Sequence, residues 1–206
     1  MRRQPKWTDT LLLLSLLLLL AGCAALQPVT LAPGKVDLTP VGQVSEGRWF
    51  IWVDEVADLR GAPAPEWFGE LDFRFHEQNA PAYLKPAPKD YLKENFSRML
   101  LDAGLEASKK EMASVYAKVE LLKFQAKRNS VGIADELAVE IDYRVTFTKA
   151  NGEVIGTIKA PGTQTMKTPS GGPESLEKMT REVVKSSLEA LAKSDVFLAA
   201  VKAGAK

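Results

Sequence analysis

The sequence predicts an α+β fold in a single domain, with a mostly antiparallel sheet of about four strands and two or three helices packed on it. Apolar residues alternate with polar ones through much of residues 115–165, which is the period of half-buried strands. Residues 90–103 and 173–201 instead repeat apolar side chains at spacings of three and four, which is the period of helices. The order of strand, long loop, helix, three strands and two helices fits a sheet covered on one face.

The chain begins with a basic segment and a short apolar run. Arg2, Arg3 and Lys6 precede residues 11–20, which are almost entirely leucine. A membrane-spanning helix needs about 20 apolar residues, so this run is too short to cross a membrane. A basic start before a short apolar stretch is typical of a secretory signal peptide. We therefore expect residues 1–22 to be a signal peptide.

The only cysteine of the chain, Cys23, directly follows this segment. Leu20, Ala21 and Gly22 precede it, and together the four residues resemble the lipobox of bacterial lipoproteins. The resemblance implies cleavage before Cys23, a diacylglyceryl group on its thiol and an N-acyl group such as palmitate on its amine. Several acyl chains bind a membrane firmly, whereas one binds only marginally. The alternatives are a secreted protein with an incidental thiol and a short signal anchor.

The residue after the cysteine bears on localisation. Ala24 stands where an aspartate would resemble an inner-membrane retention signal. We therefore expect the periplasmic face of the outer membrane, in an organism with two membranes. Beyond the covalent acyl groups on Cys23, no cofactor is expected.

Composition restricts the classes of partner. The chain has 27 Lys and Arg, 26 Asp and Glu and one His, and loss of the signal peptide changes the formal net charge from +1 to −1. Nucleic-acid binding needs a basic stripe, so we expect no nucleic-acid partner. The mature chain has no second cysteine for a disulfide, and its length suffices for one domain with a real core.

The mature chain divides into a tether and a domain. Residues 23–46 hold prolines and glycines without a helical period, which predicts a linker, although residues 29–33 and 35–40 could pair with a sheet edge. Residues 47–206 form the predicted periplasmic domain. Its first strand is expected at 47–56, with apolar side chains on both faces. Residues 61–88 are a proline-rich, aromatic insertion, and loops this long are uncommon and usually functional or disordered.

The remaining elements follow from local signals. Asp90 is the expected cap of the first helix and Gly104 follows its end. A strand from Val115 to Phe124, with a bulge before Phe124, precedes a polar loop at 127–136.

A second strand over 137–148 turns at Asn151-Gly152 into a return strand over 153–165. Pro173 suits a first helical position, and Ser194 or Asp195 would cap the last helix.

Three segments carry a resemblance to a known family. They are WFIWVDEVADLRG (49–61), LKENFSRMLLDAGLEA (92–107) and AVEIDYRVTFTKANGEVIGT (138–157). Together they resemble the YajG-type family of bacterial outer-membrane lipoproteins, over most of residues 47–201. Related architectures occur in auxiliary lipoproteins of envelope ABC transport systems and in lipoprotein activators of cell-wall synthases. The resemblance implies a lipoprotein with a small α+β domain and no assigned chemistry, from which the insertion at 61–88 departs.

Catalytic signals are weak. His76 is the only histidine, and no nucleophile elbow surrounds a serine, so we expect neither an enzyme nor a metal site. Carboxylates at 54–58 and 66–70 leave an envelope hydrolase as a distant third hypothesis. Residues 169–173 precede a helix and could hold an anion, although a turn explains them.

Asp58 and Arg60 are expected to pair and to fix the exit of the first strand.

The best candidate site is aromatic. It is predicted to receive a partner protein or a ligand, or else to close a second small core, and it comprises Phe50, Trp52, Trp67, Phe68, Phe73, Arg74 and Phe75. We therefore predict a non-enzymatic envelope accessory or adaptor that binds a protein partner. The alternative is a lipid or glycan carrier that uses the aromatic site as a pocket. An adaptor should show an exposed aromatic patch, and a carrier should show an enclosed apolar cavity.

Overall fold

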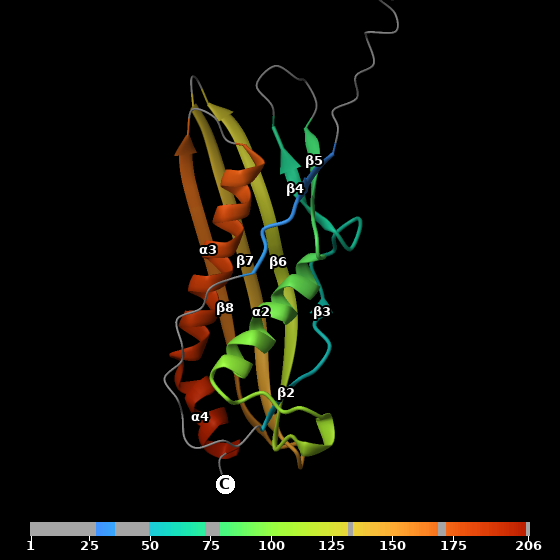
Figure 1. Cartoon of the computed structure of the whole chain (residues 1–206), viewed down its shortest axis with the longest axis vertical. Coiled ribbons are helices and arrows are strands. Elements are labelled where there is room, and N and C mark those ends of the chain that lie inside the picture. The colour runs from blue at the N-terminus through green and yellow to red at the C-terminus, as the bar shows by residue number, and fades with distance from the viewer. Residues whose placement is uncertain (1–27, 36–49, 73–78, 132–133, 169–171, 205–206) are drawn as a thin grey trace, which may run out of the picture.

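The computed structural model describes residues 28–35, 50–72, 79–131, 134–168 and 172–204. They form an elongated body in which helices cover one face of a long twisted sheet (Figure 1). In this part of the chain the strands are β1 (Val29–Leu31), β2 (Ile51–Val53), β3 (Ala57–Asp58), β4 (Trp67–Leu71), β5 (Ala80–Leu84), β6 (Val115–Val131), β7 (Ala134–Lys149) and β8 (Val154–Thr168). The helices are α2 (Pro88–Asp102), α3 (Pro173–Ala192), α4 (Asp195–Gly204) and the 3-10 turn η1 (Lys110–Met112).

The sheet corrects the predicted fold class. Within the described residues it has eight strands rather than about four, in the order β1-β5-β4-β6-β7-β8, with β2 and β3 also paired to β6. It is mixed rather than mostly antiparallel, because β2, β3 and β4 run parallel to β6, and β1 runs parallel to β5. The prediction was wrong because these strands have only two to five residues. Such short segments carry little of the alternation that reveals a strand.

The three long strands confirm the alternating pattern. β6 pairs with β7 over its whole length, and the register shifts between Leu121 and Lys123, as the predicted bulge requires. Gly152 has φ 87° in the turn before β8. The predicted loop at 127–136 is wrong, because β6 continues through Val131 and β7 starts at Ala134.

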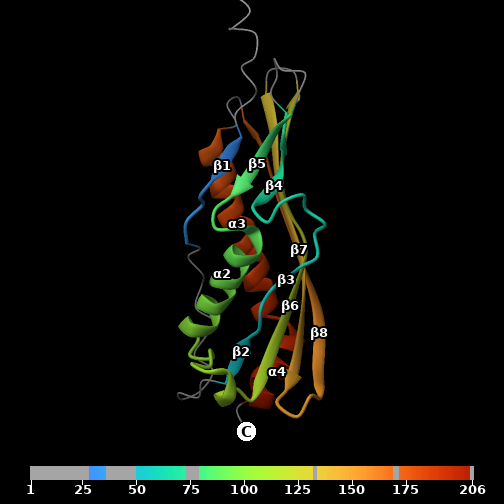
Figure 2. The same cartoon turned by 90° about the vertical axis from the view of Figure 1, so that its right-hand side faces the viewer.

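The helices begin and end close to the predicted positions. α2 starts at Pro88, two residues before the expected cap Asp90, and Ala87 precedes it without a side-chain cap. Gly104 follows α2 with φ 70°, and α3 starts at Pro173 as predicted. Figure 2 shows α2, α3 and α4 together on one side of the sheet. No helix among the described residues is long and apolar enough to cross a membrane.

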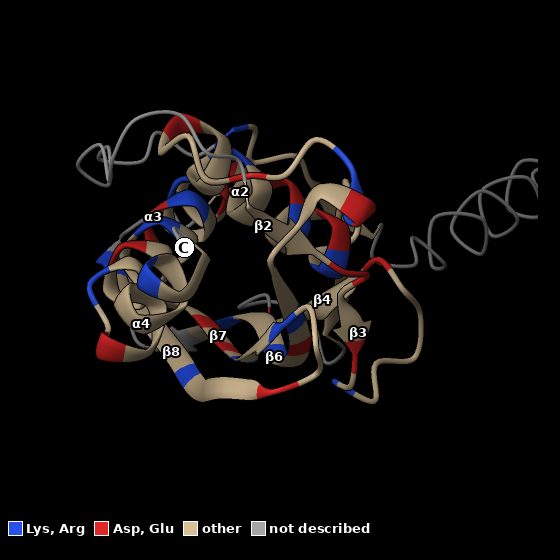
Figure 3. Cartoon of the chain, turned by 90° about the horizontal axis from the view of Figure 1, so that it is seen from below, with Lys and Arg blue, Asp and Glu red and all other residues tan. Residues whose placement is uncertain are grey.

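The core lies between the helices and the inner face of the sheet. Phe124 of β6 packs edge-on against Phe68, with ring centroids 5.1 Å apart, and lies 6.4 Å from Tyr91 of α2. Towards the other end of the sheet, Phe147 and Phe197 pack 5.9 Å apart. The outward faces of the strands carry charged residues of both signs, and seen from the C-terminal end the two signs are interspersed (Figure 3).

Candidate functional site

The structure places four of the seven predicted aromatic-site residues. Phe50 and Phe68 are buried in the core, and Trp52 and Trp67 are half-buried. Phe73, Arg74 and Phe75 lie outside the described residues, as do His76 and the four lipobox residues ending at Cys23.

These four residues are not brought together. β2 pairs with β6 at Ile51↔Val115, whereas β4 pairs with it at Gly69↔Ala126. Eleven residues of strand separate the two positions, which corresponds to about 36 Å. Phe50 and Trp52 therefore lie near one end of the sheet and Trp67 and Phe68 towards the other, with Phe50 and Phe68 serving the core.

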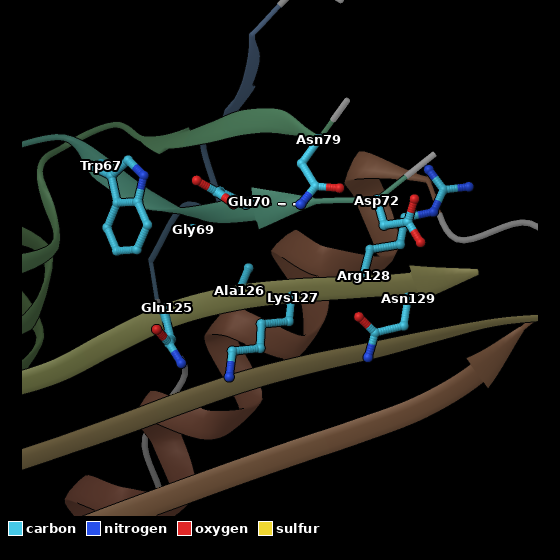
Figure 4. A pocket seen from close by; sticks show the side chains of 10 residues that line it. All are labelled: Trp67, Gly69, Glu70, Asp72, Asn79, Gln125, Ala126, Lys127, Arg128 and Asn129. Atoms are coloured by element: carbon cyan, nitrogen blue, oxygen red, sulfur yellow. Dashed lines mark hydrogen bonds between the residues drawn. The ribbon is translucent and has the colours of Figure 1, made fainter. Parts of the chain in front are cut away.

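The residues around Trp67 form a distinct feature, which we name the β4 groove. It is an open groove of about 250 Å³ where β4 meets β6 (Figure 4). Its lining consists mostly of polar and charged side chains, with one indole at its end: Trp67, Gly69, Glu70, Asp72, Asn79, Gln125, Ala126, Lys127, Arg128 and Asn129.

A glycine creates the geometry of this groove. Gly69 has φ 141°, and a Cβ placed on it would clash with the carbonyl oxygen of Ala126. The register of β4 also shifts between Trp67 and Gly69. Because the bulge changes which residues face outwards, Phe68 points into the core while Trp67 and Glu70 stay at the surface.

The walls of the groove carry opposite charges. Glu70 and Lys127 are register partners on adjacent strands. Asn79 donates to Glu70 Oε2 at 3.4 Å, and Gln125 donates to Glu140 Oε2 at 3.1 Å. The hydrogen bond from Lys123 holds the pKa of Glu140 below its usual value.

The far end of the groove is closed by an ion pair. Arg128 Nη2 lies 2.7 Å from Asp135 Oδ2, whose residue is only 4% exposed. This pair joins the last residues of β6 to the first residues of β7. It fixes the strands at the point where the sequence predicts a loop.

A second feature lies next to the groove along the chain, the segment Gly61–Glu66, which we name the Pro loop. Arg60 directly precedes the loop and binds its far end: Nη1 donates to Trp67 O at 2.7 Å and Nη2 donates to Pro65 O at 3.0 Å. Nη1 also donates to Phe124 O at 3.3 Å, which ties the loop to β6.

The predicted pair of Asp58 and Arg60 belongs to this arrangement. Arg60 Nε and Nη2 donate to the two carboxylate oxygens of Asp58 at 2.8 and 2.7 Å. The side chain of Arg60 is only 3% exposed, so the Arg60 side of the pair is shielded from solvent. These hydrogen bonds lower the pKa of the Asp58 carboxyl, against the opposing effect of its partial burial.

The Pro loop itself lines a second open hollow. It has a volume of about 290 Å³ and is lined by Asp58, residues 61–65 and Lys89. Pro63 and Pro65 are exposed, and Leu59 beside them is 56% exposed. The Pro loop thus presents small apolar side chains along this hollow.

Four of the five carboxylates considered for hydrolysis, Asp54, Glu55, Asp58 and Glu70, have cationic or amide partners. Asp54 lies 3.1 Å from Lys110 and Glu55 lies 3.5 Å from Lys89, so these neighbouring acids point to different cations. Glu70 accepts from Asn79. In the described ranges, no group of three or more potential metal ligands comes together.

Comparisons with known proteins show the fold. A protein of the DUF330 family from Xanthomonas campestris has a TM-score of 0.58 at 13% identity, covering 80% of this chain and 92% of its own. An uncharacterized protein has a TM-score of 0.51 at 13% identity, covering 80% and 97% of the two chains. A minor lipoprotein from Acinetobacter baumannii is similar at 11% identity over 69% and 90% of the chains, but its TM-score of 0.38 supports no argument.

No protein-family model and no curated protein matches the sequence. The resemblance to YajG-type lipoproteins therefore stays a prediction. The similar structures establish the architecture, and function must be argued from the surface of this chain.

Sequence reasoning found Trp67 but missed the side of the groove that β6 contributes. Gln125, Lys127 and Asn129 point from the same face of this strand, and two of them lie in the predicted loop. Their spacing of two was the available signal, because polar residues at every second position are typical of the wet face of a strand.

Proposed function

We propose that the chain is an envelope lipoprotein, anchored through Cys23 to the periplasmic face of the outer membrane, that binds a protein partner without catalysing a reaction. The partner would contact the β4 groove and the Pro loop. One observation supports this function most: the open β4 groove directly follows, along the chain, a loop that Arg60 fixes in place.

The groove and loop have the composition of a protein-binding surface. Trp67 offers an indole at the junction of the two, and tryptophan often anchors protein interfaces. Leu59 and the prolines add exposed apolar area beside it. Because Arg60 already orders the Pro loop, binding would cost little conformational entropy.

The described surface supports a lipid carrier less well. A buried lipid chain calls for an enclosed apolar pocket, whereas the two hollows described here are open and largely polar or shallow. The aromatic residues expected to line such a pocket instead include Phe50 and Phe68, which fill the core.

A glycan is the second candidate ligand. The β4 groove combines the indole of Trp67 with the amides of Asn79, Gln125 and Asn129. Amides can both donate and accept hydrogen bonds, as sugar hydroxyls require. An aromatic ring with such groups around it suits a sugar better than it suits an acyl chain.

Site-specific photocrosslinking in intact cells tests the proposed function. A photoreactive amino acid at Glu70, on the groove wall, is expected to give a discrete adduct with one protein. The same amino acid at Thr157, on the exposed β8, serves as the matched control and should give none. Trp67→Ala should remove the Glu70 adduct.

The crosslinking result has two outcomes that count against the proposal. Equal adducts from Glu70 and Thr157 would show that contacts are unspecific. An adduct that persists unchanged in Trp67→Ala would show that the groove is not the contact surface.

A further inference from the structure

The first described strand is part of the folded domain. β1 pairs with β5 in parallel, from Val29↔Ala82 to Leu31↔Leu84. Lys85 N donates to Leu31 O at 2.9 Å, and Leu31 is fully buried. The residue range expected to be a tether therefore contains a docked strand, in agreement with the sheet-edge alternative for residues 29–33.

Helix α3 holds the chain just after this strand. Ala32 N donates to Glu177 Oε1 at 2.8 Å, and Arg181 Nη1 donates to Pro33 O at 2.7 Å. Glu177 and Arg181 are four residues apart, so they lie on one face in the first half of α3. β1 is thus fixed on two sides, by the edge of the sheet and by a helix.

The position of β1 limits the distance between the domain and Cys23. Residues 24–28 are all that separate Cys23 from Val29. A fully extended chain spans at most about 3.5 Å per residue, so Val29 lies within about 21 Å of Cys23 whatever conformation those residues take.

The direction of β1 shows which end of the domain this is. β1 runs in the same direction as β5, and its first residues lie towards the end of the body at which β6 finishes and β7 begins (Figures 1 and 2). The turn between β7 and β8 and the end of α4 lie at the opposite end. The 16 residues of β7 connect the two ends, a distance of about 50 Å.

We propose that β1 is a docked strap that orients the domain on the membrane. It holds the end formed by β6 and β7 within about 20 Å of the bilayer and directs the β7–β8 turn away from it. The proposal rests on the proposed anchoring at Cys23. It also places the β4 groove, which is next to Ala126 in the last third of β6, in the half of the molecule closer to the membrane.

Energy transfer to a lipid dye tests this orientation. The acylated protein would be reconstituted into phosphatidylethanolamine–phosphatidylglycerol vesicles that contain a headgroup-labelled acceptor. A donor would be attached to an introduced cysteine at Lys167, near the proximal end, or at Ala150, in the distal turn. The two positions differ by about 43 Å along β7, so we expect transfer at Lys167 to be at least about threefold more efficient.

Two insertions provide matched variants. Twenty Gly and Ser residues after Ala25 lengthen the chain before β1 and should remove most of the difference between the two donors. The same insert after Lys35 follows β1 and should leave the difference unchanged. Circular dichroism and thermal unfolding of both variants would confirm that the domain still folds.

The outcomes separate the orientation from the anchoring. Equal transfer from Lys167 and Ala150 in vesicle-bound protein would overturn the strap, since the domain would then lie flat or tumble. An equal effect of the two insertions would overturn it as well. If Cys23 carries no acyl groups, the protein stays in the soluble fraction, and the anchoring on which the strap rests has failed.

Discussion

At the scale of single residues, Arg60 does the most to shape the candidate site. Its buried guanidinium is shared by the Asp58 carboxylate and by the carbonyl oxygens of Pro65, Trp67 and Phe124. A guanidinium suits this position because its several N–H groups diverge in one plane, which a lysine ammonium cannot reproduce. The order of the Pro loop therefore depends on one side chain.

Replacement of Arg60 should be costly. We expect Arg60→Ala to lower the free energy of unfolding by about 2–4 kcal/mol, because it leaves a carboxylate and three carbonyls without their donor. Urea unfolding followed by circular dichroism would measure the loss. Arg144→Ala is the control, since Arg144 is 41% exposed beside Glu120, and such a surface pair contributes at most about 1 kcal/mol. Similar losses in both variants would contradict this role of Arg60.

Asp58 should make part of the stability dependent on pH. Its folded-state pKa lies below the ordinary value of 3.8, because Arg60 donates to the charged carboxylate. The pair therefore contributes its full stability above that value, and the contribution is lost as pH falls through the folded-state pKa.

Asp58→Asn would reveal this dependence. The difference in unfolding free energy between the natural chain and this variant should be constant from about pH 5 to 7 and should shrink below about pH 4. Urea unfolding at each pH would measure it. A difference that grows as the solution becomes more acidic would show that the pKa is raised instead.

At the scale of elements, β4 depends on the absence of a side chain at Gly69. This residue combines a φ of 141° with a close approach to the Ala126 backbone, so any β-carbon would push β4 away from β6. The bulge at this position also decides that Trp67 faces the groove. Gly69 therefore determines both the pairing of β4 with β6 and which side chains of β4 face the groove.

Gly69→Ala should separate β4 from β6. We expect a loss of roughly 3 kcal/mol or more in unfolding free energy, with faster amide exchange along β4 than along β7. Gly61→Ala is the matched control. Gly61 has φ 67°, but a Cβ added there would meet no atom within 4 Å, so only about 1–2 kcal/mol of backbone strain is expected. Equal losses would mean that the approach to Ala126 does not matter.

The elements also show what could be predicted from the sequence. β6, β7 and β8 are predictable because their long alternation has one wet face, and the breaks at Gly104 and Gly152 are typical of a helix end and a hairpin turn. β2 lies inside the strand expected at 47–56, but the parallel pairing of β2, β3 and β4 could not be predicted, because it depends on β6, which is distant in the sequence. The polar residues 127–130 wrongly predict a loop, because the polar side of a strand resembles one in composition.

At the scale of the whole molecule, the sheet is elongated, and its two aromatic regions lie at different positions along β6. One region contains Phe50 and Trp52, and the other contains Trp67 and Phe68. The sequence predicts a shared site for Phe50 and Phe68, but each fills the core where it lies. No local pattern could show this, because the spacing between the aromatic residues is set by the register of β2 and β4 on β6. What remains at the surface is Trp67 with a polar groove at the junction of β4 and β6.

The proposed role is that of a membrane-tethered accessory that binds a protein through the β4 groove. Native mass spectrometry of the mature protein, extracted gently from envelopes, tests this role most directly. We predict a complex with a second protein that dissociates in Trp67→Ala and persists in Trp52→Ala, because Trp52 pairs at Tyr116 and lies about 25 Å from the level of Trp67 along β6. A chain that carries only a lipid or glycan mass, lost in Trp67→Ala, would contradict this role and establish a carrier.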